Sequence, residues 1–296
     1  MVKKRGILKR REEEKIRVGV VGCGAIGSEI CRAIDGDEVN GRELGLGMEL
    51  KFLIDKHPEN IEELCKRLRK KPEIIKSDSS ELAGILAEVD LVVECASQAA
   101  VREFVIPTLK KGKDVMILSV GALLEEGLFE EIERISKEKG CKVYIPSGAV
   151  AGMDGIKSGA VGGIYSVELT TRKPPSGFKG NEYVKERGID LSSIKKEEIL
   201  FIGPAKEAVK HFPENVNVAA SLSIAGIGSE ATRVKIVADP SAVENMHEIE
   251  VRGEFGKLFV RVENVPSIAN PKTSYLAALS AIATLKGVSC PIGVGT

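Results

Sequence analysis

The sequence predicts an α/β protein with a doubly wound, Rossmann-type parallel sheet followed by a second α+β domain. Between residues 17 and 148, short apolar runs alternate with amphipathic stretches, which is typical of strands alternating with helices. A glycine motif joins the first apolar run to the first amphipathic stretch. After residue 148 the pattern changes to a glycine-rich span and then to alternating strands, so a second domain is expected. The length of 296 residues agrees with two hydrophobic cores.

The glycine motif predicts a dinucleotide site because of its position. The apolar run Val18–Val21 leads directly into Gly22-x-Gly24-x-x-Gly27, and Ser28–Ile34 continues as a helix. In such a motif the first glycine allows a tight turn, the second lets a pyrophosphate approach the backbone, and the third lets helix and strand pack closely. The helix N-terminus then faces the anion. We expect the cofactor to be bound here by Gly22, Gly24, Ala25, Ile26 and Gly27.

Five apolar runs predict parallel strands that are buried on both faces, and a short sixth strand is expected at 73–76. The runs are Val18–Val21, Leu50–Ile54, Leu91–Cys95, Val115–Val120 and Val143–Ile145. Amphipathic stretches predict the helices that connect them, with Ser79 and Ser80 as caps of the second one. These stretches are Pro58–Arg69, Ser79–Ala87, Gln98–Lys110 and Leu124–Lys139, the last ended by Gly140.

The second half of the chain predicts a mixed sheet backed by helices. Glycines crowd residues 148–163, which we interpret as a crossover between domains, and the polar segment 178–196 predicts a surface excursion. Two alternating runs flank Gly253-Glu-Phe-Gly256, a hairpin signal. The expected strands are Val167–Arg172, Arg233–Val237, Glu248–Val251 and Leu258–Val262, and the expected helices are Val216–Ala225 and Ser274–Leu285.

The resulting domain limits are a charged N-terminal extension at 1–16, a dinucleotide-binding domain at 17–148 and a substrate domain at 149–270. The C-terminal helix, within 271–296, is left without assignment to either domain. No apolar run reaches 18 residues without a charge, so no membrane partner is expected. Six cysteines without a CxxC pair predict no metal site and a reducing compartment, the cytoplasm.

Composition argues against nucleic-acid binding. Lys plus Arg and Asp plus Glu both number 43, so the formal net charge is zero and no basic footprint is expected. Aromatic residues make up only 4% of the chain and tryptophan is absent, which argues against platforms for stacking bases. No nucleic-acid partner is therefore expected.

Asp55 closes the second strand and is the candidate ligand of the adenosine ribose. An acid there also repels a 2′-phosphate, whereas the adjacent Lys56 and His57 counter that repulsion, so NAD is favoured and NADP tolerated. Asp55 follows Gly27 by more than the usual ~20 residues, and the alternative is that it starts a turn. At the end of the fourth strand, Ala96 and Ser97 leave room for the nicotinamide, with ordinary turn chemistry as the alternative.

The chain has three histidines, and a proton shuttle near neutral pH usually needs one. Each of His57, His211 and His247 has a structural alternative, but His247 is best placed to reach a cleft between domains. Asn215 and Asn217 begin the apolar helix, where they either cap it or, for Asn217, reach into the cleft.

Five stretches resemble the archaeal and bacterial L-aspartate dehydrogenases along most of the chain. They are residues 20–27, Pro146–Asp154, Phe212–Ala220, Thr232–Pro240 and 263–274. The resemblance implies oxidation of L-aspartate to iminoaspartate with NAD or NADP, followed by hydrolysis to oxaloacetate and ammonia or by use in pyridine nucleotide biosynthesis. It implies His247 as the catalytic histidine. It also implies cofactor contacts from Ala149 or Ala151 and from Asn217.

Several alternatives remain open from the sequence. A homoserine dehydrogenase-like or dihydrodipicolinate reductase-like enzyme would share this architecture, and a non-catalytic NAD-binding sensor is a second alternative. We expect a homodimer, in which the apolar hairpin 248–262 pairs across a two-fold axis. The carboxylates of the substrate need cations or hydroxyl groups, and the sequence does not choose among Arg172, Lys173, Lys272, Thr170, Thr171, Thr273 and Ser274.

Overall fold

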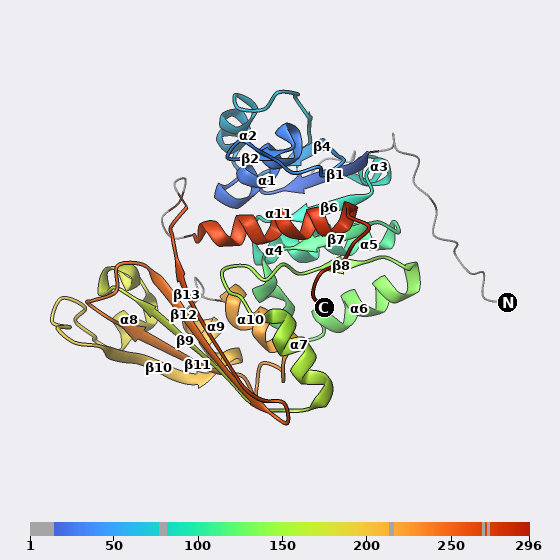
Figure 1. Cartoon of the computed structure of the whole chain (residues 1–296). Helices are drawn as coiled ribbons and strands as arrows, with labels where there is room; N and C mark the ends of the chain where they lie inside the picture. The colour runs from blue at the N-terminus through green and yellow to red at the C-terminus, as the bar shows by residue number, and fades with distance from the viewer. Residues whose placement is uncertain (1–14, 77–81, 213–215, 268–269, 271–272) are drawn as a thin grey trace.

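A computed structural model describes residues 15–76, 82–212, 216–267, 270 and 273–296. The expected caps Ser79 and Ser80, residues 1–14 of the expected extension, Asn215 and Lys272 lie outside the described residues. The described chain forms a six-stranded sheet and a five-stranded sheet, each with its own helices, in two parts that lie side by side (Figure 1). A small hairpin of β2 (Glu38–Val39) and β3 (Arg42–Glu43) follows the first helix.

The first sheet confirms the predicted doubly wound fold. Its strands follow the order β5-β4-β1-β6-β7-β8, and each neighbouring pair is parallel. Because the order reverses beside β1, the carboxyl ends of β1 and β6 border a crevice where such folds bind their ligands. The strands are β1 (Ile16–Val21), β4 (Met48–Ile54), β5 (Glu73–Ile74), β6 (Leu91–Glu94), β7 (Asp114–Ile117) and β8 (Val143–Tyr144).

The helices of this part follow the predicted stretches with differences at their ends. The helix expected over 58–69 ends at Cys65, and the helix expected over 124–139 begins at Leu128. The strand expected over 115–120 ends at Ile117, and the 3-10 helix η2 (Val120–Leu124) follows it. The helix expected over 98–110 contains a π-helical turn, because Pro107 has no backbone N–H to give to the carbonyl one α-turn earlier. The helices are α1 (Ala25–Gly36), α2 (Pro58–Cys65), α3 (Leu82–Glu88), α4 (Gln98–Ala100), η1 (Val101–Val105), α5 (Ile106–Lys110) and α6 (Leu128–Lys139).

The second sheet has the strand order β10-β11-β9-β12-β13. The pair of β11 and β9 is parallel and the other pairs are antiparallel, so the predicted hairpin is present as β12 and β13. The strands are β9 (Ile164–Lys173), β10 (Glu198–Pro204), β11 (Arg233–Ala238), β12 (Asn245–Gly253) and β13 (Gly256–Asn264). Its helices are α7 (Met153–Gly162), η3 (Pro175–Phe178), α8 (Glu182–Glu186), α9 (Ala205–His211) and α10 (Val216–Ala225).

Two segments of the second part differ from the sequence prediction. The glycine-rich span is not a bare crossover, because it contains α7. A Cβ atom at Gly159 would lie 2.5 Å from the ring of Phe255, so glycine lets α7 approach the tip of the β12–β13 hairpin. The segment 178–196 is more than a surface excursion, since Phe178, Val184 and Ile194 are buried in the core of this part.

The C-terminal helix α11 (Tyr275–Ser289) returns from the second sheet and lies beside α1 (Figure 1). Its buried face, formed by Ala281, Ile282 and Leu285, belongs to the same hydrophobic cluster as β1 and α1. The chain therefore crosses between the two parts twice, once after β8 and once between β13 and α11. The domain limits drawn from the sequence otherwise stay a prediction.

We predict that Leu285→Ala lowers the free energy of unfolding by about 3 kcal/mol, because it removes a fully buried side chain between α11 and α1. Urea unfolding monitored by circular dichroism measures the change. Lys286→Ala, an exposed neighbour on the same helix, is the matched control. Equal effects of the two substitutions would contradict the docking of α11 on α1.

Candidate active site

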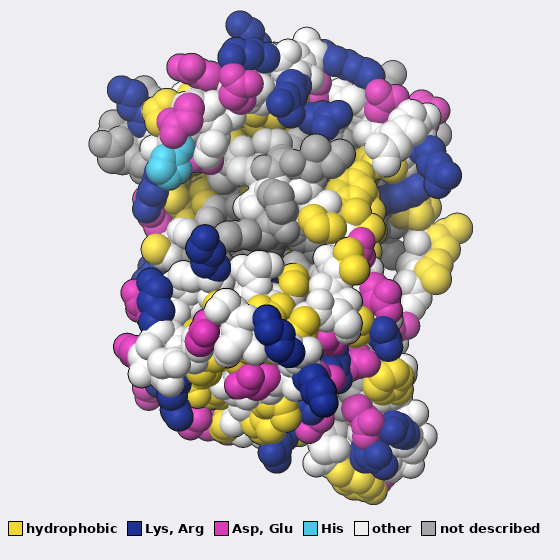
Figure 2. Space-filling model, turned by 90° about the vertical axis from the view of Figure 1, so that its left-hand side faces the viewer, with side chains coloured by type: hydrophobic (Ala, Val, Ile, Leu, Met, Phe, Trp, Pro, Cys, Tyr) yellow, Lys and Arg dark blue, Asp and Glu magenta, His cyan; other side chains and the backbone are white. Residues whose placement is uncertain are grey.

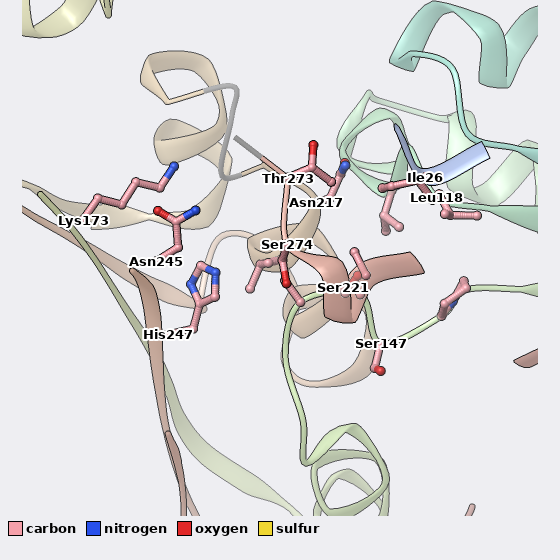
Figure 3. A pocket seen from close by; sticks show the side chains of 16 residues that line it. Ile26, Leu118, Ser147, Lys173, Asn217, Ser221, Asn245, His247, Thr273 and Ser274 are labelled. Atoms are coloured by element: carbon pink, nitrogen blue, oxygen red, sulfur yellow. The ribbon is translucent and has the colours of Figure 1, made fainter. Parts of the chain in front are cut away.

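A cavity of about 180 Å³ lies where the carboxyl ends of the first sheet meet the second sheet (Figure 3). Its wall on the side of the first sheet is apolar and is formed by Ile26, Leu118 and Val120. Polar side chains from both parts and from the start of α11 complete it. The remaining lining residues are Pro146, Ser147, Gly148, Ala149, Lys173, Asn217, Val218, Ser221, Asn245, His247, Thr273, Ser274 and Ala277.

The glycine loop beside this cavity has the geometry of a pyrophosphate cradle. Gly22 has a φ of +100°, and a Cβ there would lie 2.6 Å from the carbonyl group of Cys95. A Cβ at Gly27 would lie 1.9 Å from the carbonyl oxygen of Gly22, so α1 and β1 pack too closely for a side chain. Around Gly24, by contrast, no atom lies within 4 Å of a Cβ, which leaves the open approach that a dinucleotide needs. The loop therefore fits the predicted cofactor.

Asp55 lies at the carboxyl end of β4, next to the glycine loop. Its Oδ2 accepts a hydrogen bond from the backbone N–H of Cys23 at 2.6 Å, and its Oδ1 accepts one from the N–H of His57 at 2.8 Å. The carboxylate thus ties the glycine loop to the turn before α2. The turn role expected as the alternative is present, and the ribose role stays a prediction that this position favours.

Glu94 ends β6 and is a buried acid that sequence reasoning missed. Its Oε1 accepts hydrogen bonds from the N–H of Ala96 at 2.9 Å and from Ser119 Oγ at 2.8 Å, and its Oε2 accepts one from the Ser119 N–H at 3.1 Å. Burial raises the pKa of this carboxyl group. Glu94 fixes the two turns that border the crevice. The only available signal was an acid at the end of an apolar run.

The predicted strand-end residues Ala96 and Ser97 are exposed at the edge of the sheet and do not line the cavity. Ser97 caps α4, with its Oγ accepting from the N–H of Ala100 at 3.3 Å. Ser97 therefore has the local capping role that the sequence analysis gave as the alternative. A cofactor contact from either residue stays a prediction.

His247 lies within β12, which begins at Asn245, whereas the sequence predicted a strand that begins only at Glu248. The ring of His247 reaches the cavity (Figure 3). It is 5% exposed, and its Nδ1 lies 3.0 Å from Thr171 Oγ1 on the paired strand. Burial and then the nearby charge of Lys173 lower the pKa of His247 to about 4. The imidazole is therefore neutral near pH 7, and one of its two ring nitrogens carries a lone pair.

The other two histidines lie away from the cavity. His211 is in the last turn of α9, whereas its sequence context before Phe212-Pro213 predicts a polar loop, and its ring packs 4.4 Å from that of Tyr183. His57 precedes α2 on the surface, beside Glu59. Of the three histidines, all within the described residues, His247 is the one that lines the cavity.

Hydrogen bonds between separate segments of the chain hold the walls of the cavity together. Asn217 Oδ1 accepts from the backbone N–H of Gly121 at 2.9 Å, which ties α10 to η2. Gly148 donates its N–H to Ser280 Oγ on α11 at 3.0 Å. Of the two alanines left open by the sequence, Ala149 lines the cavity and Ala151 does not. The predicted cofactor contacts of Asn217 and Ala149 are thus compatible with their places, and both stay predictions.

Comparisons with known proteins agree over nearly the whole chain. A family model described as aspartate dehydrogenase, C-terminal, matches residues 154–288, and one described as homoserine dehydrogenase, NAD binding domain, matches residues 22–146. The L-aspartate dehydrogenase of Methanosarcina acetivorans is 53% identical over 95% of this chain and 100% of its own length. The chain belongs to the L-aspartate dehydrogenase family.

Solved structures support the same family. The crystal structure of aspartate dehydrogenase from Thermotoga maritima matches with a TM-score of 0.70 and 26% identity, covering 95% of this chain and 100% of that one. A homoserine dehydrogenase from Thiobacillus denitrificans matches with a TM-score of 0.59 and 15% identity, covering 93% and 73% of the two chains. The second likeness shows the shared fold alone.

Surface properties agree with the composition. On the face in Figure 2, basic and acidic side chains are interspersed, without a broad area of one sign. Among the residues that the structure describes, no helix has both the length and the apolar character required to cross a membrane. In the same described part, no three His, Cys, Asp or Glu side chains gather as a group able to hold a metal ion.

We predict that His247→Gln flattens the acid branch of the stability curve. The folded-state pKa of about 4 lies below the ordinary value of 6.5, so the unfolded chain binds more protons in between. The contribution of His247 to the free energy of unfolding is therefore fully present above pH 6.5. Roughly 3 kcal/mol of it is lost as the pH falls from 6.5 to 4.

Urea unfolding at several pH values measures the difference between wild type and His247→Gln. The exposed His57→Gln is the matched control and should follow the wild-type curve. Parallel curves for wild type and His247→Gln between pH 6.5 and 4 would show that His247 is not buried in its neutral form.

Proposed function

We propose that this chain catalyses the NAD(P)-dependent oxidative deamination of L-aspartate to iminoaspartate, which water converts to oxaloacetate and ammonia. Membership in the L-aspartate dehydrogenase family supports the reaction. The observation that carries the proposal is a buried, neutral imidazole that faces the apolar, dinucleotide-side wall of one cavity. A substrate between them has a proton acceptor on one side and space for a nicotinamide on the other.

His247 acts as the general base. The amine of aspartate must lose its proton before the carbon beside it can be oxidised, and the imidazole accepts that proton directly or through one water. NAD(P)⁺, held at the glycine loop, supplies the hydride acceptor. The protonated imidazole afterwards returns its proton when water adds to the imine. Holding substrate and cofactor in one cavity contributes to the rate by orientation.

Thr171 positions the base. In the tautomer that suits this role, His247 Nδ1–H donates to Thr171 Oγ1 and leaves the Nε2 lone pair for the substrate. Thr171 is completely buried and its strand is paired on both sides, so the hydroxyl group is a fixed acceptor. The ring is held at one orientation without a carboxylate partner.

The alternatives are less well supported. The model named after homoserine dehydrogenase covers only the NAD-binding residues 22–146, whereas the match over residues 154–288, which include the base, is to aspartate dehydrogenases. A sensor without turnover would not need a neutral histidine aimed into the cavity.

Three finer aspects are proposed on the same basis. The homodimer expected from the sequence would use the second sheet, where the edge strand β13 exposes Phe259. A cytoplasmic location is proposed as well, and the cysteines that are free in the described chain support it. Supply of iminoaspartate to pyridine nucleotide biosynthesis is the proposed physiological role, supported by the reactivity of the product.

We predict that His247→Ala lowers kcat for aspartate by about 10²–10⁴-fold, the usual contribution of a general base. NADH absorbance after addition of aspartate measures turnover. Affinity for NADH should be retained, because the glycine loop lies on the other part of the molecule. Normal turnover with an unchanged pH profile would remove His247 from the chemistry.

We predict that Asp55→Asn lowers kcat/KM for NAD about tenfold relative to that for NADP, because the lost charge bonded the ribose and repelled a 2′-phosphate. Steady-state kinetics with both cofactors measure the ratio. Asn60→Ala is the matched control, since Asn60 contacts Asp55 at 3.4 Å but carries no charge. An unchanged ratio in Asp55→Asn would leave Asp55 with the turn role alone.

A further inference from the structure

Lys173 differs in charge from the other described residues that line the cavity. All 16 lining residues lie within the described chain, and they include neither an arginine nor a carboxylate. With His247 neutral near pH 7, the ammonium group of Lys173 is the positive charge of this lining. Lys173 is 6% exposed, so that charge acts at low dielectric, where it attracts an anion strongly.

The pairing of β9 with β12 places Lys173 and Asn245 on the face that carries the base. Thr171 is the partner of His247 in this antiparallel pair. Side chains on a strand alternate between faces, so Lys173, two residues after Thr171, shares the face of Thr171. Asn245, two residues before His247, shares it as well. Figure 3 shows both side chains beside the histidine.

Arg172, the cation that is best suited to carboxylates by its forked shape, points to the opposite face. Its Nη1 lies 2.6 Å from Glu197 and its Nε lies 3.0 Å from Glu248, both away from the cavity lining. Thr170, also a candidate by sequence, likewise does not line the cavity. Lys272 lies outside the described residues. Among the described residues, the cation that the structure brings to the base is therefore Lys173.

We propose that Lys173 and Asn245 form the subsite for the side-chain carboxylate of the substrate, an assignment that rests on the proposed function. In Figure 3 these two residues lie at the opposite side of the cavity from Ile26 and Leu118. The reacting carbon must face that apolar wall, beside which a bound nicotinamide would lie. The side-chain carboxylate is one bond farther from the reacting carbon than the α-carboxylate, and so reaches the far end. There it meets an ammonium group and an amide N–H.

The same subsite links substrate binding to the base. The charge of Lys173 contributes to the lowered pKa of His247, and a bound carboxylate offsets that charge. His247 thus becomes a better proton acceptor when a dicarboxylate occupies the cavity. Lys173 is the charged member of the described groups around the imidazole, which are Thr171 and Lys173 of β9, Asn245 of β12, Ser221 of α10 and Ser274 before α11.

Two amides of aspartate separate the two carboxylates experimentally. L-Aspartate α-amide keeps the side-chain carboxylate, whereas L-asparagine keeps the α-carboxylate. Calorimetry on the enzyme–NADH complex measures the affinity of each without turnover. We predict that Lys173→Met weakens binding of the α-amide about 30-fold or more, the usual cost of truncating a buried charge pair, and leaves asparagine binding nearly unchanged.

Arg172→Met is the matched control, and it should leave the affinity for both ligands close to wild type. NADH affinity measured in the same samples reports folding, and Asn245→Ala provides a second variant with a smaller loss in the same direction. Equal weakening of both amides, stronger weakening of asparagine, or no change in either would overturn the assignment. Absence of aspartate turnover by the wild-type enzyme would contradict the proposed function instead.

Discussion

The register between β9 and β12 is the constraint on which the site depends. It sets Thr171 opposite His247 and thereby places the imidazole on the buried face of the second sheet. A shift by one residue would turn His247 to the outer face and bring Met246 to the cavity. The register is specified by burial, since Ile249 and Val251 continue the inward face of the same strand. Core packing of the second part thus determines where the base points.

The first part contributes a loop whose shape is also set by packing. Gly22 and Gly27 lie where any side chain would collide with backbone, and Gly24 lies where nothing does. The acids around this loop serve a related purpose: Asp55 holds its start, and Glu94 holds the turns beside it. These carboxylates shape the crevice through backbone hydrogen bonds. Such fixed dipoles can bind a cofactor without reorganising.

The two parts are joined around the cavity rather than at a single linker. α10 binds the turn after β7 through Asn217 and Gly121, while α11 binds the loop after β8 through Ser280 and Gly148. Asn264 Nδ2 donates to the carbonyl oxygen of Ala149, and its Oδ1 accepts from Ser274. Each contact fixes a segment that borders the cavity. The distance between base and cofactor site therefore depends on both crossings of the chain.

The sequence predicts the first sheet and the glycine loop, because each has a strong local signal, whereas His247 is singled out by its position and by the family resemblance. The sequence does not choose between Arg172 and Lys173, since neighbouring strand residues point to opposite faces and only pairing sets the phase. From the sequence, Gly159 is typical of a linker. Its role in the packing of α7 depends on the contact with Phe255, which the sequence does not reveal. A crystal structure with NAD and succinate tests the roles of the cavity and of His247 most directly. We predict that the dicarboxylate lies between the imidazole of His247 and the nicotinamide, with one of its carbon atoms about 3.5 Å from nicotinamide C4. A nicotinamide outside the cavity, or an imidazole facing away from the ligand, would contradict this prediction.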